Sequence, residues 1–309
     1  MKETPLEQRI RAEILADPDL QAKIEAHSKR MALLQRRLED GQELSYEDQY
    51  YYCDGLKWEY VASYPLCEDV FYFKAYMIRE NFDYGSLKPN YTQENEHQFR
   101  QMVRDWDVLL KKTDTTDPYL HVEKDELDKE LSILNRQKGK VTSIDDPEYF
   151  DALAWSKFRF LRVRKNFRLD IKSDFYTLSL NEEEILFDFK AFTHILARHF
   201  AHGKKPYQAN QDHFYSVFDP FHLHLDLEQI FKVIDQSGLY KKDAIQNITI
   251  RKKGQLYKII TRDNNYGSFI KKRIVTFYPL SKLSELSSLS RNYKEKKVAD
   301  DLFVFVKGE

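Results

Sequence analysis

The stretch IQNITIRKKGQLYKIITRDNNYGSFIKKRIVTFYP, residues 245–279, decides the fold. It contains three segments of strand character, at 245–251, 255–261 and 270–278. Lys252-Lys253-Gly254 and the segment 263–267 separate them and carry the residue types of tight turns. A further strand is predicted at 302–306. The pattern indicates an antiparallel meander.

One strand and two helices are predicted before this meander. Residues 174–180 predict a strand, because two sets of side chains alternate along it: Phe175, Thr177 and Ser179 against Tyr176, Leu178 and Leu180. Glu182-Glu183-Glu184 are predicted to open a helix, because acidic side chains suit the positive end of the helix dipole. Along that helix, one line is formed by Phe189, Phe192, Leu196 and His199. A second helix is predicted at 225–237. Helices followed by a meander define an α+β domain, with helices packed on a small antiparallel sheet.

The first half of the chain is predicted to be mainly helical. A helix from Pro18 to about Gly41 carries one apolar stripe, which is too short to favour a partner-binding coiled coil over packing on its own domain. Further helices are predicted at 94–112 and 124–136. The segment 111–147 is rich in charge and turn residues. We therefore expect a mainly α-helical, acidic domain at 1–140 and a basic α+β domain at 150–309.

Several classes of protein are disfavoured by composition. The 309 residues contain no apolar run near the roughly 20 needed to span a bilayer, and no basic-then-apolar leader at Met1. Cys53 and Cys67 form neither a CxxC pair nor a zinc-finger spacing. HExxH, GxxxxGK, GxGxxG and GxSxG motifs are absent from the sequence. We therefore expect a cytoplasmic protein that contacts no membrane and is neither a typical nucleotide-dependent enzyme nor an α/β-hydrolase.

The net charge of -1 conceals an asymmetry between the two halves. Residues 151–309 contain 28 Lys and Arg against 19 Asp and Glu, whereas residues 1–150 contain 21 against 31. A basic second half indicates an anionic partner. The alternative is a dipolar surface without functional meaning.

Six of the nine histidines lie between His194 and His224. Imidazole can both accept and donate a proton near neutral pH. His194 and His199 are five residues apart, about 140° around a helix, so we do not expect them to share one face. His194 is expected to be structural or solvated. Judged by spacing alone, His199 would more often be a hydrogen-bonded core histidine.

Basic residues recur on the predicted meander. They lie at the end of the first strand, along the second and at the start of the third: Arg251, Lys252, Lys253, Lys258, Arg262, Lys271, Lys272 and Arg273. Cations on adjacent strands can hold phosphates, and neighbouring Tyr and Phe rings can stack on bases. The alternative is that some of these residues are solvated hairpin charges.

The string His194-Ile195-Leu196-Ala197-Arg198-His199-Phe200 resembles the helix motif of phage- and toxin-associated nucleases grouped with barnase, EndoU, colicin RNase domains and RelE, the BECR fold. Similar features continue in order with the segment 219–238, the strand pair 250–260 and Val275-Thr276-Phe277-Tyr278-Pro279. The resemblance covers roughly residues 170–285. His202 in the loop and Val275-Thr276-Phe277 in the last motif depart from the family pattern.

This resemblance implies a metal-independent endoribonuclease that needs no cofactor. Such a protein acts as a toxin or as an effector of a phage or mobile element, and an antitoxin or immunity protein holds it in check. The matching catalytic positions are Arg198, His199, Lys258 and Thr276. His199 would accept the proton of a ribose 2′-hydroxyl, and Tyr257, His202 or Tyr278 would protonate the leaving oxygen. Substrate contacts are expected from Arg251, Lys253, Tyr257, Arg262, Lys272, Tyr278 and His202.

Two alternatives belong to other classes of protein. The same basic sheet could form a non-catalytic nucleic-acid-binding module. The chain could also be a phage-associated interaction protein whose second half is a degenerate nuclease fold.

Overall fold

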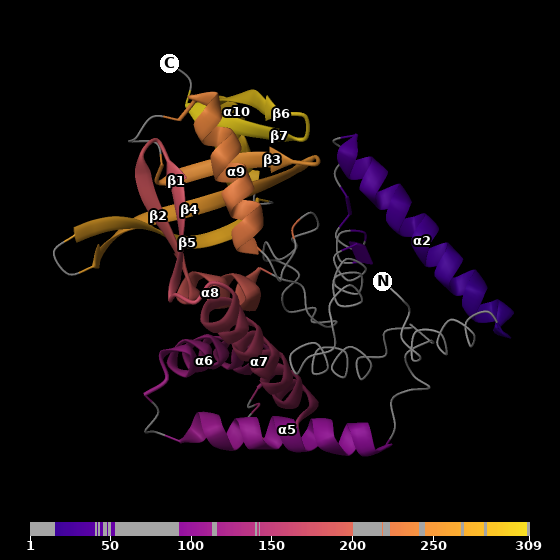
Figure 1. Ribbon diagram of the computed structural model, residues 1–309. Coiled ribbons are helices and arrows are strands. Elements are labelled where there is room, and N and C mark those ends of the chain that lie inside the picture. Colours follow the sequence, from indigo (N-terminus) through magenta and orange to yellow (C-terminus); the bar gives the residue numbers. More distant parts are fainter. Residues whose placement is uncertain are drawn as a thin grey trace.

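The computed structural model describes residues 16–40, 42, 44–45, 48, 51–52, 93–112, 116–139, 141, 143–199, 218, 223–240, 245–266, 269–280 and 283–307. Within these ranges, helices dominate the first half and a seven-stranded sheet dominates the second. Figure 1 shows the sheet above a group of four helices, α5 to α8. The α+β prediction is confirmed.

The first half contains α2 (Pro18–Glu39), α5 (Gln93–Lys111), α6 (Pro118–Lys138) and α7 (Pro147–Lys165), and a π-helical turn, η2 (Asn166–Asp170), follows α7. Helices α6 and α7 begin alike. Asp117 and Asp146 cap them, and each carboxylate accepts a hydrogen bond from the backbone N–H two residues on. A proline then occupies the first helical position, where no N–H is needed. These Asp-Pro pairs place the starts of α6 and α7 inside the segment 111–147, which the charge and turn residues of the sequence mark as a candidate domain boundary.

A buried ion-pair network joins α6 to α7. The Arg159 guanidinium lies 2.6 Å from Glu123 Oε1 and 3.1 Å from Glu130 Oε2, and all three side chains are almost inaccessible to solvent. Burial alone would lower the pKa of Arg159, but the charges of Glu123 and Glu130 outweigh it and raise that pKa. Removing one partner would therefore leave a buried charge without compensation.

The second half contains β1 (Phe175–Leu180), β2 (Glu183–Asp188), α8 (Phe189–Arg198), α9 (Leu223–Ser237), β3 (Asn247–Lys252), β4 (Gln255–Tyr266), β5 (Phe269–Pro279), α10 (Leu283–Asn292), β6 (Tyr293–Ala299) and β7 (Leu302–Lys307). The strand order is β1-β2-β5-β4-β3-β7-β6. Strands β3, β4 and β5 form the expected antiparallel meander, whereas β2 pairs with β5 in parallel. The sheet is thus larger than predicted and mixed.

Two predictions around the meander were wrong. Residues Glu183 and Glu184 do not open a helix, because they lie on β2 and pair with β1. Asn181 and Glu182 form the connecting turn, both with positive φ, as a tight two-residue hairpin requires. Helix α8 instead begins after Asp188, whose carboxylate accepts from Ala191 N. Residues 263–266, predicted as a turn, continue β4.

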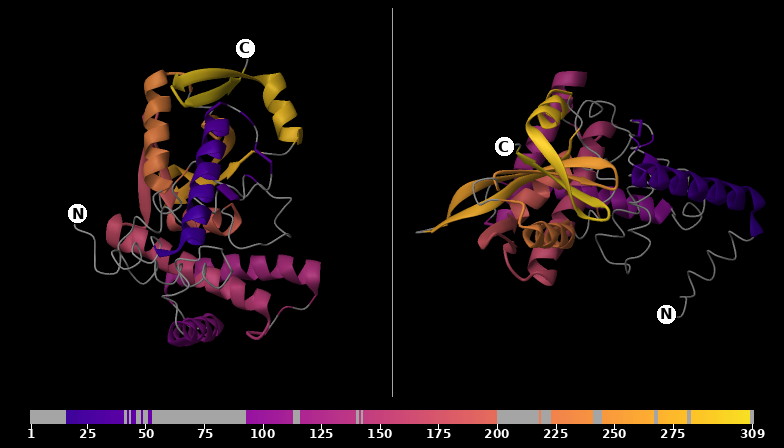
Figure 2. Two further views of the ribbon diagram at one scale, coloured as in Figure 1. Left: turned by 90° about the vertical axis from the view of Figure 1, so that its right-hand side faces the viewer. Right: turned by 90° about the horizontal axis from the view of Figure 1, so that it is seen from above.

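Helix α9 covers one face of the sheet. Its Leu227, Ile230 and Ile234 belong to the same buried cluster as Ile259 and Phe277 of the sheet. Figure 2 shows α9 and α10 on opposite sides of the sheet. The side chains that alternate with these buried residues therefore point away from α9.

The main hydrophobic core crosses the predicted boundary between residues 140 and 150. It runs from Phe99 of α5 through α6, α7 and α8 to Val304 of β7. Within the described residues, a separate small cluster lies at α2 and contains Met31, Leu34, Leu44 and Tyr52. In the same part of the chain, no helix has both the length and the apolar character to cross a bilayer.

Candidate active site

Strands β4 and β5 place three predicted site residues on one face of the sheet. Lys258 of β4 lies opposite Tyr278 of β5, and Thr276 is two residues before Tyr278. Their neighbours Tyr257, Ile259 and Phe277 are fully buried on the face that α9 covers. Successive side chains on a strand point to opposite faces. We call the face that carries Lys258, Thr276 and Tyr278 the site face.

A β-bulge on β5 allows Thr276 to lie on the site face while Ile274 and Phe277 are both buried. Ile260 pairs with Thr276 and Thr261 pairs with Ile274, so Val275 is an extra residue without a partner on β4. Ile274 and Phe277, three residues apart, are both fully buried as a result. Val275 is 36% exposed. The bulge turns Ile274 into the core while Thr276 stays on the site face.

His199 reaches the site face from the end of α8. The helix ends at Arg198, and His199 is its C-cap residue, with φ −121 and ψ −2. Its Nε2 lies 3.0 Å from Thr276 Oγ1. Its ring stacks on that of Tyr278, with centroids 5.3 Å apart and planes 25° apart. The ring is only partly buried, so it is a polar, accessible group rather than a core histidine.

A carboxylate from α10 completes this side of the site. Glu285 Oε1 lies 2.8 Å from Lys258 Nζ and accepts a hydrogen bond from the Tyr278 hydroxyl at 3.1 Å. The side chains of Lys258 and Glu285 are 24% and 25% exposed. The ammonium group is therefore within reach of an anionic ligand, but it already has an anionic neighbour.

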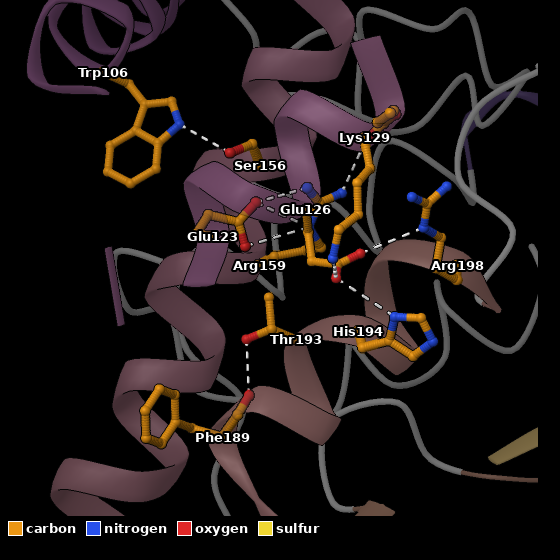
Figure 3. A network of polar contacts seen from close by, with 11 residues as sticks. Trp106, Glu123, Glu126, Lys129, Ser156, Arg159, Phe189, Thr193, His194 and Arg198 are labelled. Carbon is orange, nitrogen blue, oxygen red and sulfur yellow. Dashed lines mark hydrogen bonds and ion pairs between the residues drawn. The ribbon is translucent and has the colours of Figure 1, made fainter. Parts of the chain in front are cut away.

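Helix α6 supplies a second carboxylate, on the other side of α8. Figure 3 shows Glu126 directed at Arg198, His194 and Lys129. The distances are 3.3 Å to Arg198 Nε, 3.5 Å to His194 Nδ1 and 2.7 Å to Lys129 Nζ. Burial alone would raise the pKa of Glu126, but the hydrogen bonds and charges of His194 and Lys129 hold it below its ordinary value.

The expectation that His194 and His199 cannot meet was wrong. Their rings pack edge to face, with centroids 5.6 Å apart. The angular argument assumes that both residues belong to one regular helix. His199 leaves the helix at the C-cap, so its side chain is no longer bound by the helical angle.

The structure brings together some of the other predicted substrate contacts but not all. Tyr257 is fully buried beside Phe218 and Phe277 on the α9 face, so it does not reach the site. Arg262 lies farther along β4, where it is exposed, and Lys253 is in the β3–β4 turn. His202 lies outside the described residues.

The cations of the sheet are largely paired with carboxylates. The pairs are Arg251 with Glu295, Lys252 with Asp301, Lys258 with Glu285, Lys271 with Glu184, Lys272 with Asp263 and Arg273 with Asp188. These contacts reduce the positive potential that the sequence predicts. A phosphate ligand would have to compete with them or join them.

Glu126 and Glu285 were not identified from the sequence. Glu285 lies six residues after Pro279, close enough to the last motif that a carboxylate there could have been considered. Glu126 is 68 residues before His194 and belongs to the acidic half, so no local pattern connects it to the site.

Comparisons of the chain with protein-family models, with curated proteins and with solved structures find no match. Among the described residues, no group of three or more His, Cys, Asp and Glu side chains is arranged to hold a metal ion. The arrangement offers an imidazole for proton transfer, two hydroxyls, an ammonium and a guanidinium. These are the groups that act in general acid–base chemistry on an anionic substrate.

Proposed function

We propose that the protein is an endoribonuclease that cleaves RNA by transesterification and needs no metal ion. The observation that carries this proposal is the gathering of His199, Thr276, Tyr278 and Lys258 at one place. These residues come from α8, β4 and β5, which are far apart in sequence. Their types are those that the nuclease resemblance implies.

In this scheme, His199 accepts the proton of a ribose 2′-hydroxyl. The 2′-oxygen forms a bond to the adjacent phosphorus, the bond from phosphorus to the 5′-oxygen breaks, and a 2′,3′-cyclic phosphate results. Thr276 fixes the orientation of the imidazole through the 3.0 Å contact to Nε2. Tyr278 supports the ring from one side.

Lys258 and Arg198 stabilise the charge that develops on the phosphoryl oxygens. Lys258 is the better placed of the two, because it lies opposite Tyr278, on which His199 stacks. Arg198 is next to His199 in the chain and is held at Nε by Glu126. Arg251 extends the basic surface. Thr249 of β3 pairs with Lys258 of β4, and Arg251 lies two residues after Thr249, so its side chain points to the same face as Lys258.

The proposal includes a cytoplasmic role as a toxin or as an effector of a phage or mobile element. An antitoxin or immunity protein that covers the site face would hold the activity in check. Expression in a bacterial host should then be toxic, and His199→Ala should relieve the toxicity.

The test is cleavage of RNA by the purified full chain in EDTA. We expect products that end in a 2′,3′-cyclic phosphate, and His199→Ala should slow cleavage at least about 100-fold. His121→Ala, an exposed histidine of α6, is the matched control and should cleave like the wild type. Loss of cleavage in EDTA, or an active His199→Ala, would overturn the proposal. Intact RNA that binds with a steep salt dependence would favour the binding module instead.

A further inference from the structure

We infer that His194 is the second proton-transfer group of the site and that Glu126 positions it. This inference rests on the proposed RNA cleavage. It gives the acidic N-terminal half a part in the chemistry, because Glu126 belongs to α6. The sequence favoured a structural or solvated His194.

The first argument is the contact between Glu126 and His194. Glu126 is 5% exposed, and its Oε1 lies 3.5 Å from His194 Nδ1, which is long for a hydrogen bond but within ion-pair range. Figure 3 shows the carboxylate between His194 and Arg198. An ionised carboxylate only accepts hydrogen bonds, so Nδ1 carries the hydrogen and Nε2 becomes the nitrogen that exchanges a proton with substrate.

The second argument is the position of His194 beside His199. The two ring centroids are 5.6 Å apart and the rings are nearly perpendicular. Cleavage by the 2′-hydroxyl needs one group that removes its proton and another that protonates the leaving 5′-oxygen. Two imidazoles at this separation are close enough to serve one phosphodiester. The His194 side chain is 34% exposed, so a substrate can reach it.

The third argument is that the two imidazoles are held by different partners. Thr276 of β5 contacts His199, and Glu126 of α6 contacts His194. Different surroundings are how two similar titratable groups come to take opposite roles. The hydroxyl partner suits a neutral base at His199, and the carboxylate partner suits a proton donor at His194.

Other donors that the sequence predicts are less well placed among the described residues. Tyr257 is fully buried on the α9 face. The Tyr278 hydroxyl donates to Glu285 at 3.1 Å. His194 combines exposure, a positioning carboxylate and a ring contact with the proposed base.

The test compares two short RNAs of the same sequence, each containing the linkage that the wild type cuts fastest. One has the natural phosphodiester, and the other has sulfur in place of the bridging 5′-oxygen. A thiolate leaves without a proton, so a substrate with sulfur does not need the donor. We expect His194→Ala to slow cleavage of natural RNA about 100-fold or more and to cut the sulfur-containing RNA at near the wild-type rate. His199→Ala should slow both.

Glu126→Gln tests the positioning role with the same two substrates. We expect Glu126→Gln to slow cleavage of natural RNA about tenfold more than cleavage of the sulfur-containing RNA, because the loss of proton donation affects only the natural substrate, whereas the loosened Arg198 affects both. Asp125→Asn, an exposed carboxylate on the same helix, is the control and should change neither rate. Thermal unfolding of every variant checks that the fold is retained.

Equal slowing of both substrates by His194→Ala, or no slowing of either, would overturn the inference. In that case, loss of both activities in His199→Ala would show that the proposed function still stands. If the wild type leaves natural RNA intact in EDTA, the proposed function itself fails.

Discussion

At the scale of single residues, Glu285 sets how available Lys258 is to a phosphate. Its carboxylate lies 2.8 Å from the ammonium, so an anionic ligand that binds Lys258 would have to compete with it. We expect Glu285→Gln to tighten RNA binding about two- to fivefold, as loss of a partly exposed ion pair allows. Gln can still accept the Tyr278 hydrogen bond. Equilibrium binding of RNA to His199→Ala and to the double variant measures this without cleavage.

The control for Glu285 is Asp125→Asn, which removes one negative charge from an exposed position on α6, a different element. It should leave RNA binding unchanged. Weaker binding by the Glu285→Gln variant would mean that Glu285 orders the site rather than competes with the ligand.

Thr276 is the residue that connects β5 to His199. Thr276→Val keeps the shape and the strand preference but removes the hydroxyl that lies 3.0 Å from Nε2. We expect cleavage to fall roughly three- to tenfold, the effect of one lost hydrogen bond, with little change in melting temperature. Thr177→Val on β1 is the matched control, because that side chain is exposed. Steady-state RNA cleavage is the readout, and an unchanged rate would remove Thr276 from the site.

At the scale of elements, the bulge at Val275 decides which side chains of β5 face the core. Deleting Val275 would force either Ile274 or Phe277 out of its buried position, because side chains alternate strictly without the bulge. We expect the free energy of unfolding to fall by about 2–3 kcal/mol or more, the effect of exposing one large apolar side chain. Val275→Ala keeps the bulge and should cost much less. Chemical denaturation measures both, and equal stability would contradict the argument.

The contact between α6 and α8 predicts how stability depends on pH. The pKa of Glu126 is lower in the folded protein than its ordinary value of 4.5, so the folded state favours the ionised carboxylate. This contribution is fully present above pH 4.5 and is lost as the pH falls through the folded pKa. We expect the wild type to lose more stability than Glu126→Gln on acidification below pH 4.5. Unfolding curves at several pH values would show this as a difference in slope, and parallel curves would refute it.

At the scale of the whole molecule, local patterns predicted the elements better than their contacts. The helices α2, α5 and α9 and the strands β3 and β7 were predicted from local residue patterns, and the structure contains them. Strand β2 was missed because its acidic start imitates a helix start, and only pairing with β1 and β5 decides between the two. His199, Thr276, Tyr278 and Lys258 were predicted, but the carboxylates that hold the site were not. Arg198 and Glu126 are 72 residues apart, and no local signal reports such a contact.

The continuous core predicts which fragments of the chain will fold. A fragment of residues 150–309 would lack α6, and with it the Tyr119 ring that stacks on Phe189 with centroids 4.3 Å apart. We expect this fragment to show no cooperative thermal transition. A fragment of residues 93–309 keeps the main core and should melt cooperatively, because the α2 cluster is separate. Circular dichroism on heating tests both, and a cooperative transition in the shorter fragment would show that its helices and sheet fold independently.

The bond between His199 and Thr276 also bears on the order in which the protein is made. The groups near the two imidazoles are spread along the chain from Glu126 to Glu285, and Thr276 is synthesised 77 residues after His199. A nascent chain therefore holds the histidine long before it holds the surface against which that histidine is aligned. The alignment of His199 by Thr276 can therefore form only after a further 77 residues have been synthesised.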